Sequence, residues 1–117
     1  MYDGGKKMAI LSSDVLRGHV EAIILNSLSD GRKYGYEIRG FIETKSKGLY
    51  KPNEQSVYSA LHRMEGCGYI KGSWGDERSG ATRKYYEMTE AGRIMLENKR
   101  TEWEAAKLVI DALLSRD

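Results

Sequence analysis

The sequence contains few of the residues that cross-link a chain, hold a metal or break a helix. A single cysteine, Cys67, excludes an internal disulfide and leaves too few thiols for a cysteine-based zinc site. No apolar run is longer than four residues, as in Ala22–Leu25, which is far shorter than the ~20 residues of a membrane-spanning helix. The first residues also lack the apolar stretch and cleavage site of a secretory signal. We therefore expect a cytoplasmic protein that makes no membrane contact.

What remains is the composition of one ordinary globular domain. The chain has 117 residues, of which 40% are hydrophobic and 31% charged, so intrinsic disorder and fibrous repeats are excluded. The net charge is only +2, but residues 31–85 carry 11 Lys and Arg against 6 Asp and Glu. Positive charge gathered in the middle of the chain would attract a polyanion such as DNA.

Apolar residues at helical spacing predict three helices in the first half of the chain. The first runs over residues 13–28, and a turn signal at 29–31 ends it. The second opens at 34–38 and closes with the polar and glycine residues 45–48. Pro52 and the favoured N-cap residue Asn53 then start a third helix that extends to about Cys67.

The third helix has two contrasting faces. At about 100° per residue, Val57, Ala60, Leu61 and Met64 fall on one side. The opposite side carries side chains that form hydrogen bonds or are cationic. One face is therefore predicted to be core and the other to contact a polar partner.

The second half of the chain predicts a β-hairpin followed by a long helix. Residues 69–74 and 82–88 are rich in aromatic and β-branched side chains, and the polar, glycine-bounded segment 75–81 separates them. Thr89 is a suitable N-cap for a helix of about 25 residues that ends at Leu114. Residues on one side of this helix recur every three or four positions, as in a coiled coil.

Three helices, a hairpin and a long terminal helix form the plan of a winged helix-turn-helix. We therefore predict a mainly α fold of the α+β type, with a two-stranded wing. The expected division is a flexible lead-in over residues 1–12, a DNA-binding domain over 13–88 and a dimerisation helix over 89–117. A major groove about 12 Å wide admits one helix, so the polar face of the third helix is the predicted reading surface.

The candidate DNA ligands fall into three groups. Some are predicted to contact base edges from the third helix, and others to hold phosphates at the mouth of the second helix. Those around the hairpin are predicted either to hold phosphates or to place Arg78 in a neighbouring minor groove. Tyr34, Lys33 and Tyr36 lie at the second helix; Gln55, Ser56, Tyr58, Ser59, His62 and Arg63 lie on the third; Lys71, Arg78, Arg83 and Lys84 surround the hairpin.

Four segments, in this order, resemble the PadR family of bacterial winged-helix transcriptional regulators. They are LRGHVEAIIL, YGYEI, SVYSALHRMEGCGYI and RKYYEMTEAG, and the resemblance covers nearly the whole chain. It implies a homodimer on a palindromic operator, repression of a nearby gene and release by a small molecule. The single short terminal helix resembles the compact branch of the family. Tyr58, Arg63 and Trp103 match family residues in the recognition and dimerisation helices, whereas residues 53–55 depart from the family pattern and leave the operator sequence open.

The first and last helices carry the residues expected at the dimer interface. They are Leu16, Val20, Leu96, Lys99, Trp103, Ala106, Ile110 and Leu113. A hydrophobic or aromatic effector is expected to bind at the same place. For Trp103 two interpretations stay open: a purely structural part of the dimer core, or a surface on which a planar effector stacks. Trp74, Tyr69, Tyr85 and Tyr86 are expected to pack within the wing.

Other functions have little support in the sequence. His19, His62 and Cys67 lack the spacing of metal ligands, so we expect no metal and no other cofactor. His19 is expected to be a packed, hydrogen-bonded residue, and Cys67 an inert thiol rather than a redox switch. The chain shows no phosphate-binding loop or catalytic triad, so an enzyme is not expected. The alternative to a regulator is a winged-helix module that binds proteins and has lost specific DNA binding.

Overall fold

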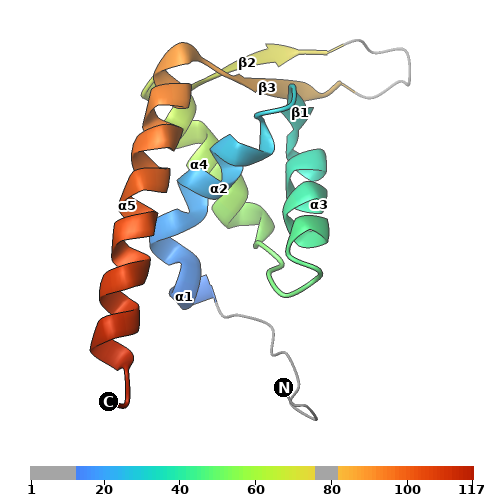
Figure 1. The fold of residues 1–117 in the computed structure, drawn as a ribbon. Coiled ribbons are helices and arrows are strands. Elements are labelled where there is room, and N and C mark those ends of the chain that lie inside the picture. The colour runs from blue at the N-terminus through green and yellow to red at the C-terminus, as the bar shows by residue number, and fades with distance from the viewer. Residues whose placement is uncertain (1–12, 76–81) are drawn as a thin grey trace.

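The computed structural model describes residues 13–75 and 82–117, which form a helical domain with a small antiparallel sheet and one protruding helix (Figure 1). The elements are α1 (Ser13–Leu16), η1 (Arg17–His19), α2 (Val20–Ser27), β1 (Lys33–Tyr34), α3 (Gly35–Lys45), α4 (Glu54–Gly66), β2 (Ile70–Trp74), β3 (Lys84–Met88) and α5 (Glu90–Leu114). This order confirms the predicted winged helix-turn-helix.

The sheet has three strands in the order β1-β3-β2, one more than the wing predicted from the sequence. β3 pairs with β2 from Ile70 opposite Met88 to Trp74 opposite Lys84. On its other edge, β3 pairs with the two residues of β1. The N-terminus of α3 is thereby fixed beside the hairpin.

The first helix also differs from expectation, because the single helix predicted over residues 13–28 is interrupted. The 3₁₀ turn η1 separates α1 from α2. Gly18 lies in the middle of this turn and has a low helix propensity. The interruption redirects the chain where it passes both α4 and α5.

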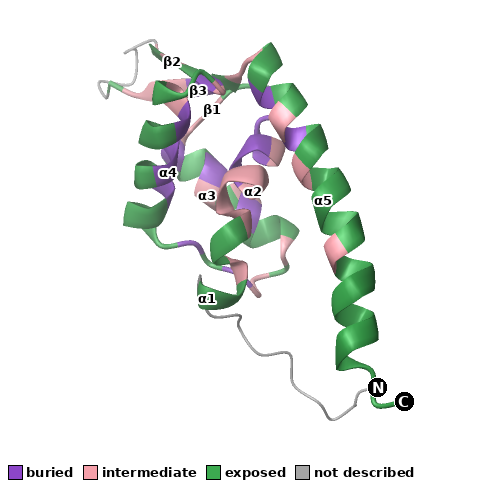
Figure 2. Ribbon diagram, turned by 90° about the vertical axis from the view of Figure 1, so that its left-hand side faces the viewer, coloured by how far each residue is buried: buried purple, intermediate pink, exposed green. Residues whose placement is uncertain are grey.

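One apolar core joins every longer element. α2, α3 and α4 supply most of it, the sheet closes one end, and the first turns of α5 close the side (Figure 2). The core residues are Ile24, Leu25, Leu28, Ile38, Ile42, Tyr50, Val57, Ala60, Leu61, Met64, Ile70, Tyr86 and Leu96. Complete burial of one such aliphatic side chain contributes about 1.5–3 kcal/mol to folding.

The end of α4, the start of β2 and the start of α5 meet at Gly68 and Tyr69. Gly68 has a positive φ of 84°, and the Gly68 and Tyr69 N–H groups donate to the Glu65 and Met64 carbonyls, which ends α4 in a Schellman motif. The Thr89 hydroxyl donates to the Gly68 carbonyl at 2.7 Å, and the Thr89 N–H donates to the Tyr69 carbonyl at 3.1 Å. We call this meeting point the α4–α5 junction.

Candidate nucleic-acid interface

The outward face of α4 is the centre of the candidate interface. Gln55, Ser59 and His62 point away from the core and are exposed, whereas the apolar side predicted from the sequence is buried. Asn53 caps the helix, because its Oδ1 accepts the Ser56 N–H at 3.1 Å. The exposed side of α4 and the outer ends of β2 and β3 lie on the same side of the molecule, away from α5 (Figure 2). These elements present a continuous face to a partner.

Tyr58 and Gly35 join α4 to the start of α3. A Cβ atom on Gly35 would lie 2.3 Å from the Tyr58 hydroxyl oxygen, so the tyrosine ring covers the glycine directly. The Tyr34 N–H donates to Glu37 Oε1 at 3.2 Å and closes the first turn of α3. Tyr36, the next residue of this turn, is exposed. Three of the predicted tyrosine ligands are thus brought to one edge of α4.

Two contacting tyrosine rings lie beside this edge, and each carries an arginine side chain. The Arg83 guanidinium lies 4.7 Å from the Tyr34 ring centroid, and the Arg32 guanidinium lies 4.4 Å from that of Tyr85. The two tyrosine rings meet edge to face at 5.4 Å. Cation–π contacts of this kind hold both guanidinium groups beside the outer half of the hairpin, where Tyr85 pairs with Ser73. Arg32 could not be predicted from the sequence, because it follows a turn and its ring partner, Tyr85, is distant along the chain.

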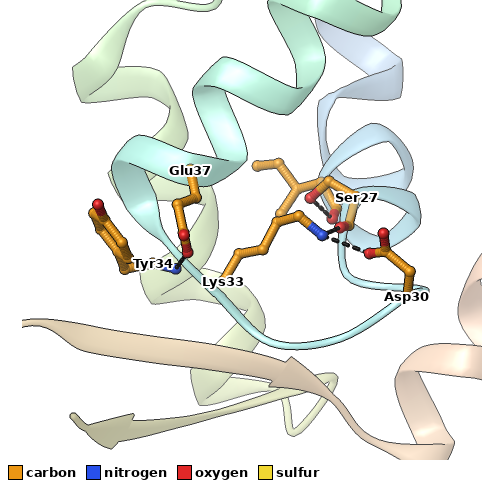
Figure 3. A network of polar contacts seen from close by, with 6 residues as sticks. Ser27, Asp30, Lys33, Tyr34 and Glu37 are labelled. Carbon is orange, nitrogen blue, oxygen red and sulfur yellow. Dashed lines mark hydrogen bonds and ion pairs between the residues drawn. The ribbon is translucent and has the colours of Figure 1, made fainter. Parts of the chain in front are cut away.

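Lys33 is not the phosphate ligand that the sequence predicted. Its ammonium donates to the Ser27 carbonyl at 2.7 Å and to Asp30 Oδ1 at 2.5 Å (Figure 3). The hydrogen bond and the positive charge of Lys33 lower the pKa of the Asp30 carboxyl. Because only 15% of the Lys33 side chain is exposed, this residue fixes the turn between α2 and β1 instead.

Two further predicted cations pair with carboxylates of the protein itself. Lys84 Nζ lies 2.9 Å from Glu65 Oε1, and this hydrogen bond raises the pKa of Lys84. Arg63 Nε lies 2.9 Å from Glu21 Oε2 and so ties α4 to α2. Both cations remain beside the exposed face, but each is partly neutralised. Lys71 is exposed on β2, whereas Arg78 lies outside the described residues.

Trp74 also departs from the sequence prediction, because it does not pack within the wing. It is 66% exposed near the outer end of β2, with Lys84 Nζ 6.0 Å from its ring centroid. Tyr86 is buried as expected, and Tyr69 and Tyr85 are half-buried. The wing core is therefore smaller than the aromatic content of its strands indicates.

The predicted interface residues of the first and last helices divide into two groups. Leu96 is only 3% exposed and belongs to the core of its own chain, while Leu16, Val20, Lys99 and Ala106 are half-buried. Trp103, Ile110 and Leu113 are exposed on the second half of α5. Trp103 is 43% exposed, and His19 of η1 meets its ring edge to face at 5.2 Å. His19 is therefore packed, against an aromatic partner.

Other kinds of site are not found among residues 13–75 and 82–117. No group of three or more His, Cys, Asp or Glu side chains in this part of the chain is placed to hold a metal. None of its helices has both the length and the apolar character needed to cross a membrane. Cys67 is exposed directly after α4.

A winged helix-turn-helix with an exposed polar helix and with arginines beside the outer half of its wing is the architecture of a DNA-binding protein. Residues 24–98 match the transcriptional regulator PadR-like family, and the chain belongs to this family. It is therefore a DNA-binding transcriptional regulator and not an enzyme.

Solved structures from several bacteria are similar over most of the chain. A transcriptional regulator from Clostridium thermocellum is 42% identical, with a TM-score of 0.83 over 91% of this chain and 100% of that one. A PadR family transcription regulator from Clostridium difficile R20291 is 34% identical, with a TM-score of 0.73 over 84% of this chain and 100% of that one. A PadR-like transcriptional regulator from Bacillus cereus ATCC 14579 is 30% identical, with a TM-score of 0.75 over 90% and 100%.

Proposed function

We propose that the protein is a dimeric repressor that binds a palindromic operator and is released by a small planar aromatic effector. The outward face of α4 is the main support for DNA binding. There Gln55, Ser59 and His62 are exposed between flanking basic and tyrosine side chains. Side chains of these types form hydrogen bonds with base edges, and the flanking cations suit phosphates. Arg78 remains a proposed wing contact.

The proposed homodimer is supported by the exposed apolar residues of the second half of α5. Trp103, Ile110 and Leu113 expose large apolar side chains to solvent in a single chain. A second copy of the helix would cover them and would place two recognition helices about 34 Å apart, one turn of DNA. Leu16, Val20, Lys99 and Ala106 would lie at the margin of the same interface.

The first test is a titration of the protein against the DNA upstream of its own gene and against a scrambled duplex, at two salt concentrations. We expect the promoter DNA to bind about 10³-fold more tightly than the scrambled duplex, and both affinities to fall as salt rises. Weak, salt-insensitive binding to both duplexes would contradict the regulator and favour the protein-interaction module.

The effector is proposed to stack on Trp103. Its ring is partly exposed, meets His19 edge to face and has the Lys107 ammonium 6.0 Å from its centroid, and a planar aromatic molecule could compete for such a ring. In a Trp74→Phe background, Trp103 is the only tryptophan left, and its emission reports on this position.

We expect planar aromatic compounds to quench or shift the Trp103 emission and to weaken operator binding by about 5- to 150-fold. Compounds that release the operator without altering the emission would place the effector elsewhere. Unchanged emission and unchanged DNA affinity at saturating concentrations of a panel of such compounds would contradict this effector class.

A further inference from the structure

A polar groove runs between η1 and the exposed face of α4. Arg17 and Val20 form one wall, and Ser56, Ser59 and Arg63 form the other. Its volume is about 470 Å³. The sequence predicted DNA contacts for the α4 wall but not for Arg17, which falls in the first predicted helix and outside the groups chosen as DNA ligands.

Outside its buried side, α4 presents three sectors around the helix axis. Tyr58 and Glu65 face α3 and the sheet, as their contacts with Gly35 and Lys84 show. Arg63 faces α2 and η1, as its ion pair with Glu21 shows. At about 100° per residue, Gln55 and His62 fall between these two sectors. The base-reading sector is therefore narrow. On one side it meets the sector that faces α3 and the sheet (the α3 border), and on the other the sector that faces α2 and η1 (the η1 border).

The dimensions of DNA place a sugar-phosphate strand next to each of these two borders. An α-helix with its side chains is about 10–12 Å across and nearly fills a major groove about 12 Å wide. A sugar-phosphate strand then runs along each side of the helix. Tyr34 and Arg83 lie beside the α3 border, and Arg17 and Arg63 lie on the η1 border.

The two arginines of the η1 border have donors available for an anion. Arg63 uses Nε to bind Glu21, which leaves its terminal amino groups, with four of its five N–H donors, to turn toward the groove. The Arg17 side chain is 77% exposed and pairs with Asp14, which is also exposed. An ion pair between two exposed groups is weak and gives way to a phosphate.

We infer that Arg17 and Arg63 bind the phosphates of the DNA strand on the η1 side of α4, with Glu21 as a positioning residue for Arg63. Arg63 is then a phosphate ligand and not a base reader. The inference rests on the proposed DNA binding through α4. It adds contacts to the sugar-phosphate strand on the η1 side, and these contacts would fix the position of the protein along the DNA. Sequence preference stays with Gln55, Ser59 and His62.

The test compares the variants Arg17→Ala, Arg63→Ala and Gln55→Ala on promoter and scrambled DNA over a range of salt concentrations. Each arginine variant is expected to bind both duplexes about fivefold more weakly. Log affinity should also fall less steeply with log salt, with the magnitude of the slope reduced by about 0.9. Gln55→Ala is expected to weaken only promoter binding. Arg116→Ala removes an equal charge from the exposed end of the chain and is expected to change neither affinity nor slope.

Glu21→Gln separates positioning from a merely structural role. It keeps a hydrogen-bond acceptor for Arg63 but removes a negative charge beside the phosphate strand, so binding to both duplexes is expected to tighten about twofold to threefold. A purely structural Glu21 would give weaker binding. Circular dichroism and the unfolding midpoint of each variant show whether it remains folded.

Four results would overturn the inference while wild-type DNA binding stands. The first is that both arginine variants keep the wild-type salt slope, and the second is that Arg63→Ala loses only its preference for the promoter. The third is that Glu21→Gln is folded but binds DNA more weakly. The fourth is that inorganic phosphate displaces the DNA more effectively than chloride does at equal ionic strength. The last result would assign the groove to a free anion. Failure of the wild-type protein to bind DNA would instead contradict the proposed function.

Discussion

Gly92→Ala is expected to lower the free energy of unfolding by about 2–4 kcal/mol. A Cβ atom at this position would lie 2.1 Å from the Tyr69 carbonyl oxygen and 3.0 Å from Met88 Cγ. The Tyr69 carbonyl cannot move freely, because it accepts the Thr89 N–H. The methyl group would therefore separate α5 from the sheet or distort the α4–α5 junction. Thermal and urea unfolding at one fixed protein concentration measure the loss.

Gly40→Ala is the matched control for this substitution. Gly40 is also helical, but no atom lies within 4 Å of the position that its Cβ would occupy. Alanine there is expected to stabilise the protein by about 0.5–1 kcal/mol, because it has the higher helix propensity. Equal stability of Gly92→Ala and wild type would contradict the close approach of α5 to Tyr69.

Ile110→Glu is expected to give a folded monomer that binds the promoter about 10²- to 10⁴-fold more weakly than wild type. Ile110 lies on α5 in the part that protrudes from the domain, so the domain core does not depend on it. In the proposed dimer the glutamate would be buried against apolar side chains without a partner, which strongly disfavours association. Two half-sites would then have to be bound independently. Light scattering measures the mass, and promoter titration measures the affinity.

Ser115→Glu adds the same charge just after the last turn of α5, at an exposed polar position. It is expected to leave both the mass and the promoter affinity unchanged. A dimer that persists in Ile110→Glu would show that the subunits associate through another surface. A monomer that keeps full promoter affinity would show that dimerisation does not contribute to DNA binding.

The helices of this protein could be predicted from local signals. Asn53 and Thr89 cap α4 and α5 as expected, and both helices have the predicted boundaries to within about one residue. The two-residue strand β1 could not be predicted, since it exists only through its pairing with Tyr85 and Tyr86. The interruption at η1 was also missed, because the apolar spacing continues through it.

The candidate interface shows the same division between local and distant information. Periodicity alone predicted which side of α4 is exposed. It could not show that Arg63 and Lys84 have carboxylate partners, because Glu21 is 42 residues and Glu65 is 19 residues away along the chain. The interior position of Lys33 and the exposure of Trp74 likewise depend on how distant segments pack.

The α4–α5 junction joins α4 and α5 into one rigid unit. Hydrogen bonds from Thr89 attach the start of α5 to the residues that end α4 and begin β2. α5 has 25 residues and is therefore about 38 Å long. If this unit rotates by about 5° about the junction, the far end of such a helix is displaced by about 3 Å. In a dimer joined through α5, a small change in helix crossing angle would alter the separation of the two DNA-binding domains without deforming either one.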